Sequence, residues 1–165
     1  MAKQNSVIID PGHGGSDPGA VYGNRREKDD TLALAYDIGN ALEQRGIRVE
    51  YTRIGDIYNS PYEKAEIGNR SAADLFLSIH RNAMPVPGTG SGTMSLIFGR
   101  GGDAETFARN INKELAKTGW KDLGISERPN LVVLRDTALP AVLVEVGFID
   151  NENDNDFFDA NMRQT

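Results

Sequence analysis

Short β-branched runs alternate with segments of helical periodicity along this chain, and this alternation restricts the possible folds more than any other feature. We expect strands at residues 6–10, 47–52, 75–79, 94–98, 131–134 and 141–146. We expect helices at residues 27–44, from Pro61 to about residue 72, and at residues 103–117. Alternating strands and helices are typical of a largely parallel sheet that is covered by helices on both faces. The sequence therefore predicts an α/β fold.

Length and charge limit the possible classes of protein. The chain has 165 residues, which suits a single domain with a substantial core. Its formal net charge is −6, whereas nucleic-acid-binding proteins usually carry a basic face, so we expect no nucleic-acid partner. No run of 18 apolar residues is present, so no membrane insertion is expected. The first residues lack the apolar core of a signal peptide, which predicts either export by another route or a leader that was removed.

Several common kinds of active site are excluded or disfavoured by what the sequence lacks. It has no cysteine, which excludes disulfides, thiolate metal ligands and a cysteine nucleophile. The stretch GHGGSDPG places Asp17 at the third glycine position of a dinucleotide-binding motif, and no Walker sequence follows, so a phosphate-binding loop is disfavoured. No GxSxG motif surrounds any serine, which argues against a serine hydrolase.

Both histidines of the chain follow predicted strands. His13 lies in the stretch VIIDPGHGGSDPGA, just beyond the first strand, and His80 directly follows the run LFLSI. In α/β sheets, ligands bind beyond the carboxyl ends of the strands, so both histidines stand where a site is expected. A histidine at a strand end can also be purely structural, and that alternative stays open for each of them.

Two glutamates can complete a metal site with these histidines. Glu27 opens the first predicted helix, where a carboxylate is also favoured simply by the helix dipole. Glu145 interrupts the apolar run AVLVEVGF, and burying a carboxylate in a central strand is costly unless it is paired or metal-bound. The alternative for Glu145 is an edge strand that turns it to solvent. Two histidines and one glutamate are a suitable ligand set for catalytic zinc, and a further carboxylate can take the proton from the attacking water.

Four motifs carry a family resemblance, and they span nearly the whole chain: IIDPGHGGSDPGA, REKDDTLALA, ADLFLSIHRNA and PAVLVEVGFIDN. In this order they resemble the zinc-dependent N-acetylmuramoyl-L-alanine amidases of the Amidase_3 type, which are bacterial and phage enzymes that cleave peptidoglycan. The resemblance implies a central sheet of about six strands flanked by helices. It also implies one Zn²⁺ ion, with His13, Glu27 and His80 as its ligands and Glu145 as the catalytic carboxylate.

The resemblance implies a function, with two alternatives from other classes. The implied reaction is hydrolysis of the amide bond between N-acetylmuramic acid and L-alanine by a catalytic domain that spans residues 1–165. The sequence does not establish the oligomeric state, and we favour a monomer. Because the substrate is peptidoglycan, the protein is expected to act in the bacterial cell wall or outside the cell. A phage lysin would act in the periplasm or cell wall of the host. One alternative is a zinc carboxypeptidase-like peptidase, although such enzymes place histidine and glutamate three residues apart. The other is a non-catalytic cell-wall-binding module, which the presence of all four chemical residues disfavours.

A loop rich in proline, glycine and serine at residues 81–93 is expected to line the substrate groove. Within this loop, Arg81 is expected either to bind the acidic peptide of the substrate or to be a solvated side chain. Asn82 belongs to the matched motif SIHRNA and is expected to contact the substrate.

Two departures from the family pattern concern the surroundings of the site. The family closes with a helix after residues 148–150, whereas this chain ends at Thr165, where that helix should begin. We therefore expect that the chain is trimmed or that the helix is disordered or replaced, and that its packing face on the sheet is exposed. Some relatives carry an inserted helix between the second histidine and the catalytic glutamate, and this helix plugs the zinc site. Here the segment from Arg81 to Pro140 has room for one strand, one helix and one further strand, which predicts an open site.

Overall fold

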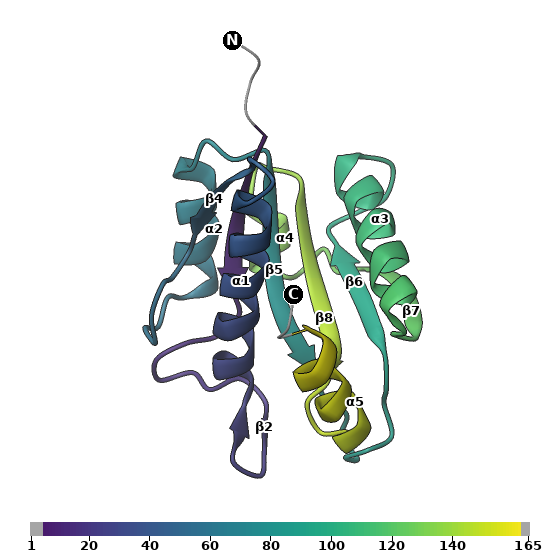
Figure 1. Ribbon diagram of the computed structural model, residues 1–165. Coiled ribbons are helices and arrows are strands. Elements are labelled where there is room, and N and C mark those ends of the chain that lie inside the picture. Colours follow the sequence, from purple (N-terminus) through teal and green to yellow (C-terminus); the bar gives the residue numbers. More distant parts are fainter. Residues whose placement is uncertain (1–4, 163–165) are drawn as a thin grey trace.

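A six-stranded sheet forms the centre of the computed structural model, which describes residues 5–162 (Figure 1). Its strands are β1 (Ser6–Pro11), β4 (Arg48–Tyr51), β5 (Leu75–Asn82), β6 (Thr93–Ile97), β7 (Asp122–Glu127) and β8 (Ala141–Phe148). The strand order is β4-β1-β5-β8-β6-β7, and every neighbouring pair is parallel except β6 and β8. The predicted mostly parallel sheet of about six strands is therefore confirmed.

Helices cover both faces of this sheet, as predicted. The longer ones, α1 (Glu27–Glu43) and α3 (Asp103–Thr118), pack on one face, where Leu34 and Ala108 join one apolar cluster. On the other face, α2 (Pro61–Arg70) and the one-turn α4 (Val132–Arg135) join a second cluster. The remaining elements are a small hairpin of β2 (Val21–Tyr22) and β3 (Arg25–Arg26), then α5 (Glu152–Phe157) and a π-helical turn, η1 (Phe158–Met162).

Period-two alternation along the central strands assigns each side chain to one face. The face under α1 and α3 receives alternate residues of β5 and β8, namely Leu75, Leu77, Ile79, Val142, Val144 and Val146. The face under α2 and α4 receives the residues between them, including Phe76 and Leu143. His80 and Glu145 continue this second series and are direct partners in the β5–β8 register. The alternation therefore brings both polar side chains to the same face, near the carboxyl ends of two adjacent strands.

One predicted strand is wrong and one strand was missed. The run LVVLR, expected to contain a strand at residues 131–134, is the start and body of helix α4, and its Val133 and Leu134 are buried in the second cluster. A short apolar run cannot be assigned to strand or buried helix from periodicity alone, which explains this error. The sixth strand is β7, whose sequence DLGISE is half-exposed and contains Gly124 with a φ of 87°. An edge strand of this composition lacks the apolar signal used to find strands.

Two helical elements, α5 and η1, follow Asp150. The expectation that the chain ends where a helix after residues 148–150 should begin is therefore corrected. Asn151 caps α5 by accepting a hydrogen bond from the Asp154 amide, and Phe158 is fully buried. The absence of a longer closing helix stays a prediction.

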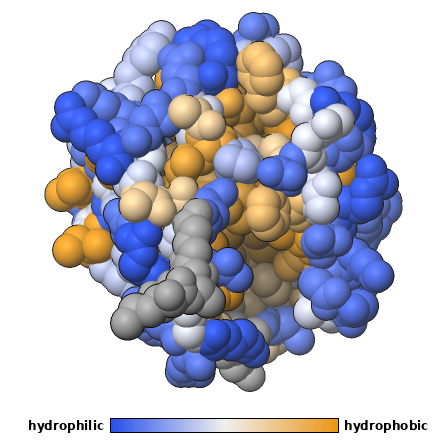
Figure 2. Space-filling view, turned by 90° about the horizontal axis from the view of Figure 1, so that it is seen from above, coloured by the Kyte–Doolittle hydropathy of each residue, from blue (hydrophilic) through white to orange (hydrophobic). Residues whose placement is uncertain are grey.

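An apolar groove of about 450 Å³ lies between α1 and α3 on the sheet, and the space-filling view shows the surface hollowed over apolar side chains (Figure 2).

No helix within residues 5–162 is both long enough and apolar enough to cross a membrane.

Candidate metal centre

The loop after β1 carries His13 in an unusual backbone conformation. His13 has a φ of 61°, and it is the one non-glycine residue with positive φ among those the structure describes. Positive φ is costly for a side chain with a Cβ atom and is found mainly where the surroundings enforce it. Two backbone hydrogen bonds between Gly14 and Asp17, of 2.9 and 3.0 Å, close the turn that follows.

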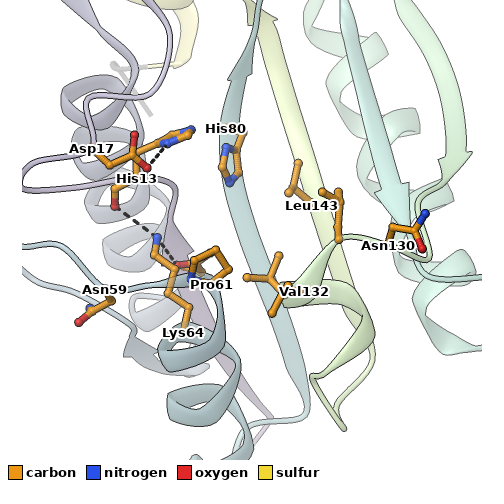
Figure 3. A pocket seen from close by; sticks show the side chains of 12 residues that line it. His13, Asp17, Asn59, Pro61, Lys64, His80, Asn130, Val132 and Leu143 are labelled. Carbon is orange, nitrogen blue, oxygen red and sulfur yellow. Dashed lines mark hydrogen bonds and ion pairs between the residues drawn. The ribbon is translucent and has the colours of Figure 1, made fainter.

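Buried cations hold the carbonyl groups of this loop. The Lys64 ammonium lies 2.9 Å from Asp10 Oδ1 and donates to the carbonyl oxygens of Pro11 and His13, at 2.8 and 3.3 Å (Figure 3). The Arg53 guanidinium donates to the Pro11 carbonyl as well. Burial raises the pKa of Asp10, but Lys64 and two hydroxyl donors outweigh it and lower that pKa. These contacts supply the surroundings that keep His13 in its strained conformation.

Two glycines of the loop are required because the ligand side chains pack directly on the backbone. A Cβ atom on Gly12 would lie 2.5 Å from His80 Cε1. A Cβ atom on Gly19 would lie 2.5 Å from His13 Cδ2 and 2.6 Å from Glu27 Oε2. No side chain fits at such distances, so these glycines make room for the histidine rings and the carboxylate.

Glu27 lies between the two histidines. Its Oε2 is 3.0 Å from His13 Nε2 and its Oε1 is 3.0 Å from His80 Nδ1, while the two rings stand at 78° with centroids 4.9 Å apart. Two backbone amides, those of Ala20 and Arg81, also donate to the carboxylate at 2.9 and 3.0 Å. The structure therefore brings together the three predicted ligands, although 53 residues separate Glu27 from His80.

The donor atoms of His13, Glu27 and His80 fit a zinc ion. All three lie within 4.8 Å of one another. Tetrahedral zinc with bonds of about 2.0–2.1 Å sets neighbouring donors about 3.3 Å apart, close to the two 3.0 Å separations seen here. The second ring nitrogen of His13 lies 2.8 Å from Asp17 Oδ2, the carboxylate–histidine arrangement that orients metal ligands. Two histidines and one glutamate are also the ligand set of several catalytic zinc sites.

Opposite pKa shifts reflect this cluster. Burial raises the pKa of Glu27, but hydrogen bonds and charge interactions with both histidines outweigh it, so that pKa lies well below its usual range. Burial lowers the pKa of His13, but hydrogen bonds and charge interactions with Glu27 and Asp17 raise it above 6.5. The carboxylate is thus held ionised, and the raised pKa of His13 means that it binds a proton more firmly than a free histidine does.

Zinc affinity should fall in acid because this proton must leave before His13 can bind zinc. The sign follows from the raised pKa of His13: protonation stabilises the metal-free fold below about pH 6.5, and this stability is lost as the pH rises through the raised value. We expect the zinc Kd to increase by about tenfold per pH unit below that value, as release of one proton requires. Competition against a chromophoric chelator between about pH 6 and about pH 8 measures this slope. A Kd that is constant over this range would contradict the assignment of His13 as a ligand.

Glu145 stands apart from the three ligands but lines the same recess, of about 390 Å³. Its strand β8 is central, between β5 and β6, so the alternative of an edge strand that turns Glu145 to solvent is wrong. Its Oε2 is buried and accepts no hydrogen bond from the described residues. Burial raises the pKa of Glu145, and the weaker opposing effect of His80 does not reverse this shift. A carboxylate with one buried, unpaired oxygen and a raised pKa is suited to accept and return a proton.

The two predicted substrate contacts differ in their placement. The Arg81 side chain is fully buried, and its guanidinium donates to Asp30 at 2.6 Å and to Asn155 at 2.7 Å. It also lies 4.1 Å from the centroid of the Phe158 ring, and burial lowers its pKa to about 10. Arg81 is thus neither solvated nor directed toward a substrate, and both expectations for its side chain are corrected. Asn82 is half-buried, and its contact with substrate stays a prediction.

Three neighbours of the site were missed in the sequence. Asp17 entered the sequence analysis only as a departure from a dinucleotide-binding motif, although its spacing of four residues from His13 could have indicated a partner. Lys64 lies 51 residues from His13 in the sequence, and no local pattern connects it to the loop that it holds. Arg128 lines the recess that contains Glu145 and the ligands, and a basic residue in the loop after an unrecognised strand gave no signal.

Solvent reaches the ligands, whose histidine side chains are 24% exposed for His13 and 18% exposed for His80. Between His80 and Glu145 the described elements are β6, α3, β7 and α4. The short α4 borders the site through Leu131 and Val132 and forms its wall (Figure 3). That the site is open at all times stays a prediction.

The chain matches, over residues 7–165, the family model described as N-acetylmuramoyl-L-alanine amidase. It is 40% identical over 152 residues to N-acetylmuramoyl-L-alanine amidase CwlM of Bacillus licheniformis, and 36% identical over 154 residues to an endolysin of Bacillus phage SPP1. These matches cover 90% of this chain but 58% and 56% of the two relatives, so the chain spans little more than half their length. The crystal structure of N-acetylmuramoyl-L-alanine amidase from Clostridium difficile 630 is similar with a TM-score of 0.91 and 32% identity, covering 98% of this chain and 90% of that chain. This chain therefore belongs to the N-acetylmuramoyl-L-alanine amidase family.

Proposed function

We propose that this chain hydrolyses the amide bond between N-acetylmuramic acid and the L-alanine of the stem peptide in peptidoglycan, with one bound Zn²⁺ ion. The observation that carries this proposal is the pairing, in one recess, of a His13–Glu27–His80 cluster with the unpartnered carboxylate of Glu145. The first group is suited to hold a metal and the second to move a proton. Similarity to proteins named N-acetylmuramoyl-L-alanine amidase supports peptidoglycan as the substrate.

The protein groups divide the work between holding and proton transfer. His13 Nε2, His80 and a Glu27 oxygen would hold the zinc, which supplies a water of lowered pKa and polarises the scissile carbonyl when bound. Asp17 orients the His13 ring through its other nitrogen. The backbone amides of Ala20 and Arg81 fix the Glu27 carboxylate, so that its oxygens face the histidines.

Glu145 takes the proton of the attacking water and delivers it to the nitrogen of the leaving alanine. Its raised pKa favours both halves of this task, because the carboxylate then binds the proton firmly enough to carry it. Its position opposite His80 in the β5–β8 register, outside the three clustered donors, supports this role. Among the described residues, Glu27 is the other carboxylate that lines this recess, and both of its oxygens contact a histidine.

The site of action follows from the substrate. Peptidoglycan lies outside the cytoplasm, so the chain would act in the bacterial cell wall, outside the cell, or on the host wall if it belongs to a phage lysin. We retain a monomer as the expected state.

Digestion of purified peptidoglycan with the zinc-loaded protein tests the proposal. We expect new alanine amino termini, released stem peptides and intact glycan chains. New amino termini on other residues would instead support the carboxypeptidase-like peptidase. Binding without any new terminus would support a wall-binding module, and new reducing sugar ends would identify a glycosidase.

A further inference from the structure

The recess that contains Glu145 extends from the metal cluster across β8 and β6. Its walls include Leu96 from β6, Leu143 from β8 and Leu131 before α4, and its volume of about 390 Å³ is within the range of about 300–1,000 Å³ that is usual for small-ligand sites. Two basic residues line it, Arg81 and Arg128. These two cations are the candidates to bind a negatively charged part of a substrate there.

Arg81 is not available for that role. Its side chain is fully buried and its charge is paired with Asp30 at 2.6 Å. Other basic side chains around the site are also engaged: Lys64 pairs with Asp10, and Lys28 pairs with Asp56 at 2.8 Å.

Arg128 is exposed, and within residues 5–162 its guanidinium contacts no carboxylate but only a hydroxyl and a carbonyl oxygen. Its backbone is nevertheless well held, because its amide donates to the Ile97 carbonyl at 2.8 Å and its carbonyl accepts from the Leu131 amide at 3.1 Å. One guanidinium nitrogen, Nη1, donates to the Glu127 carbonyl at 2.9 Å and to the Ser126 hydroxyl. The other donors carry no hydrogen bond within residues 5–162. Arg128 is therefore a preorganised cation with a free donor pair at the wall of the recess.

We propose that Arg128 is a specificity-determining residue that binds a carboxylate of the stem peptide. This inference rests on the proposed function, since it assigns part of the same substrate to the same recess. A guanidinium binds a carboxylate through two parallel hydrogen bonds, and such charge-assisted bonds are stronger than neutral ones. The stem peptide offers two carboxylates near the scissile bond, the α-carboxylate of an isoglutamate at its second residue and the terminal carboxylate of a tripeptide. Arg128 is the basic residue lining the recess whose charge is not paired with another described side chain, so it is suited to discriminate peptides by this carboxylate.

Binding to an inactive variant separates this inference from the reaction itself. The zinc-loaded Glu145→Gln protein is titrated calorimetrically with three muramyl tripeptides: one with both carboxylates free, one amidated at the second residue, and one amidated at the carboxyl terminus. We expect amidation of one carboxylate to weaken binding by about tenfold, as loss of a charge-assisted hydrogen bond predicts. Adding Arg128→Met should make all three peptides bind equally, at the weaker affinity. Arg128→Lys should retain part of the preference, because it keeps the charge and loses the planar fork.

A matched control uses Arg109, an exposed arginine on α3 that is paired with Glu105. Arg109→Met in the same background should keep the full preference for the free carboxylate. The inference is overturned if the Glu145→Gln protein binds the free and amidated peptides equally. It is also overturned if a preference for the free carboxylate survives when Arg128→Met is added to that protein. If the wild-type chain releases no alanine peptide but Arg128 still sets this preference, the proposed function fails while the carboxylate site stands.

Discussion

We expect replacement of Glu145 by glutamine to slow hydrolysis strongly and to leave zinc binding intact. The substitution keeps the shape of the side chain but removes its ability to accept a proton, and general-base catalysis typically contributes about 10²–10⁴-fold in rate. Zinc should remain because Glu145 is not one of the three clustered donors. We expect kcat on a defined muropeptide to fall by about this factor, with one zinc per chain by elemental analysis.

The control for this variant is Glu114→Gln, which changes an exposed glutamate on α3 that is paired with Lys117. It should retain both activity and zinc. Retained hydrolysis in Glu145→Gln would exclude Glu145 as the base. Loss of zinc from Glu145→Gln would instead show that this carboxylate acts as a ligand.

We expect replacement of His80 by alanine to remove zinc and activity together. His80 supplies one of three clustered donors, and Glu27 Oε1 then keeps only the Arg81 amide as a partner at 3.0 Å. Loss of an outer hydrogen-bonding partner alone costs about 10–100-fold in metal affinity, so loss of a direct ligand should exceed this. We expect zinc to be absent after dialysis, by elemental analysis, and muropeptide hydrolysis to be at background.

Asn130→Ala is the matched control, because Asn130 borders the same site but supplies no clustered donor. It should keep one zinc per chain. Circular dichroism of His80→Ala shows whether the fold is retained, which we expect because His80 belongs to neither apolar cluster. Stoichiometric zinc in a folded His80→Ala protein would contradict the proposed ligand set.

The fold class and the position of the site could be predicted because both depend on period-two patterns. Alternation along β5 and β8 places His80 and Glu145 on one face near adjacent carboxyl ends, and the position of His13 follows from the end of β1. Glu27 required the resemblance, because a carboxylate that opens a helix is expected from the helix dipole alone.

The errors have physical causes that no local pattern reveals. The edge strand β7 is half-exposed and lacks a run of apolar residues. The single helical turn α4 has such a run, so the apolar pattern predicted a strand at α4 and none at β7. The burial of Arg81 depends on Asp30, Asn155 and Phe158, which only the folded chain brings to it. Tertiary contacts of this kind decide whether a basic residue in a matched motif faces a substrate or the core.

Hydrolysis of a single muramyl tripeptide in water enriched with oxygen-18 tests the central claim most directly. Cleavage of the amide by water must place one labelled oxygen on the lactyl carboxyl group of N-acetylmuramic acid and release an unlabelled peptide with a free alanine amino terminus. Mass spectrometry of the two products reads this pattern in one experiment. Label on the peptide carboxyl groups, or an unlabelled lactyl carboxyl group, would contradict the assignment of this site as an amidase.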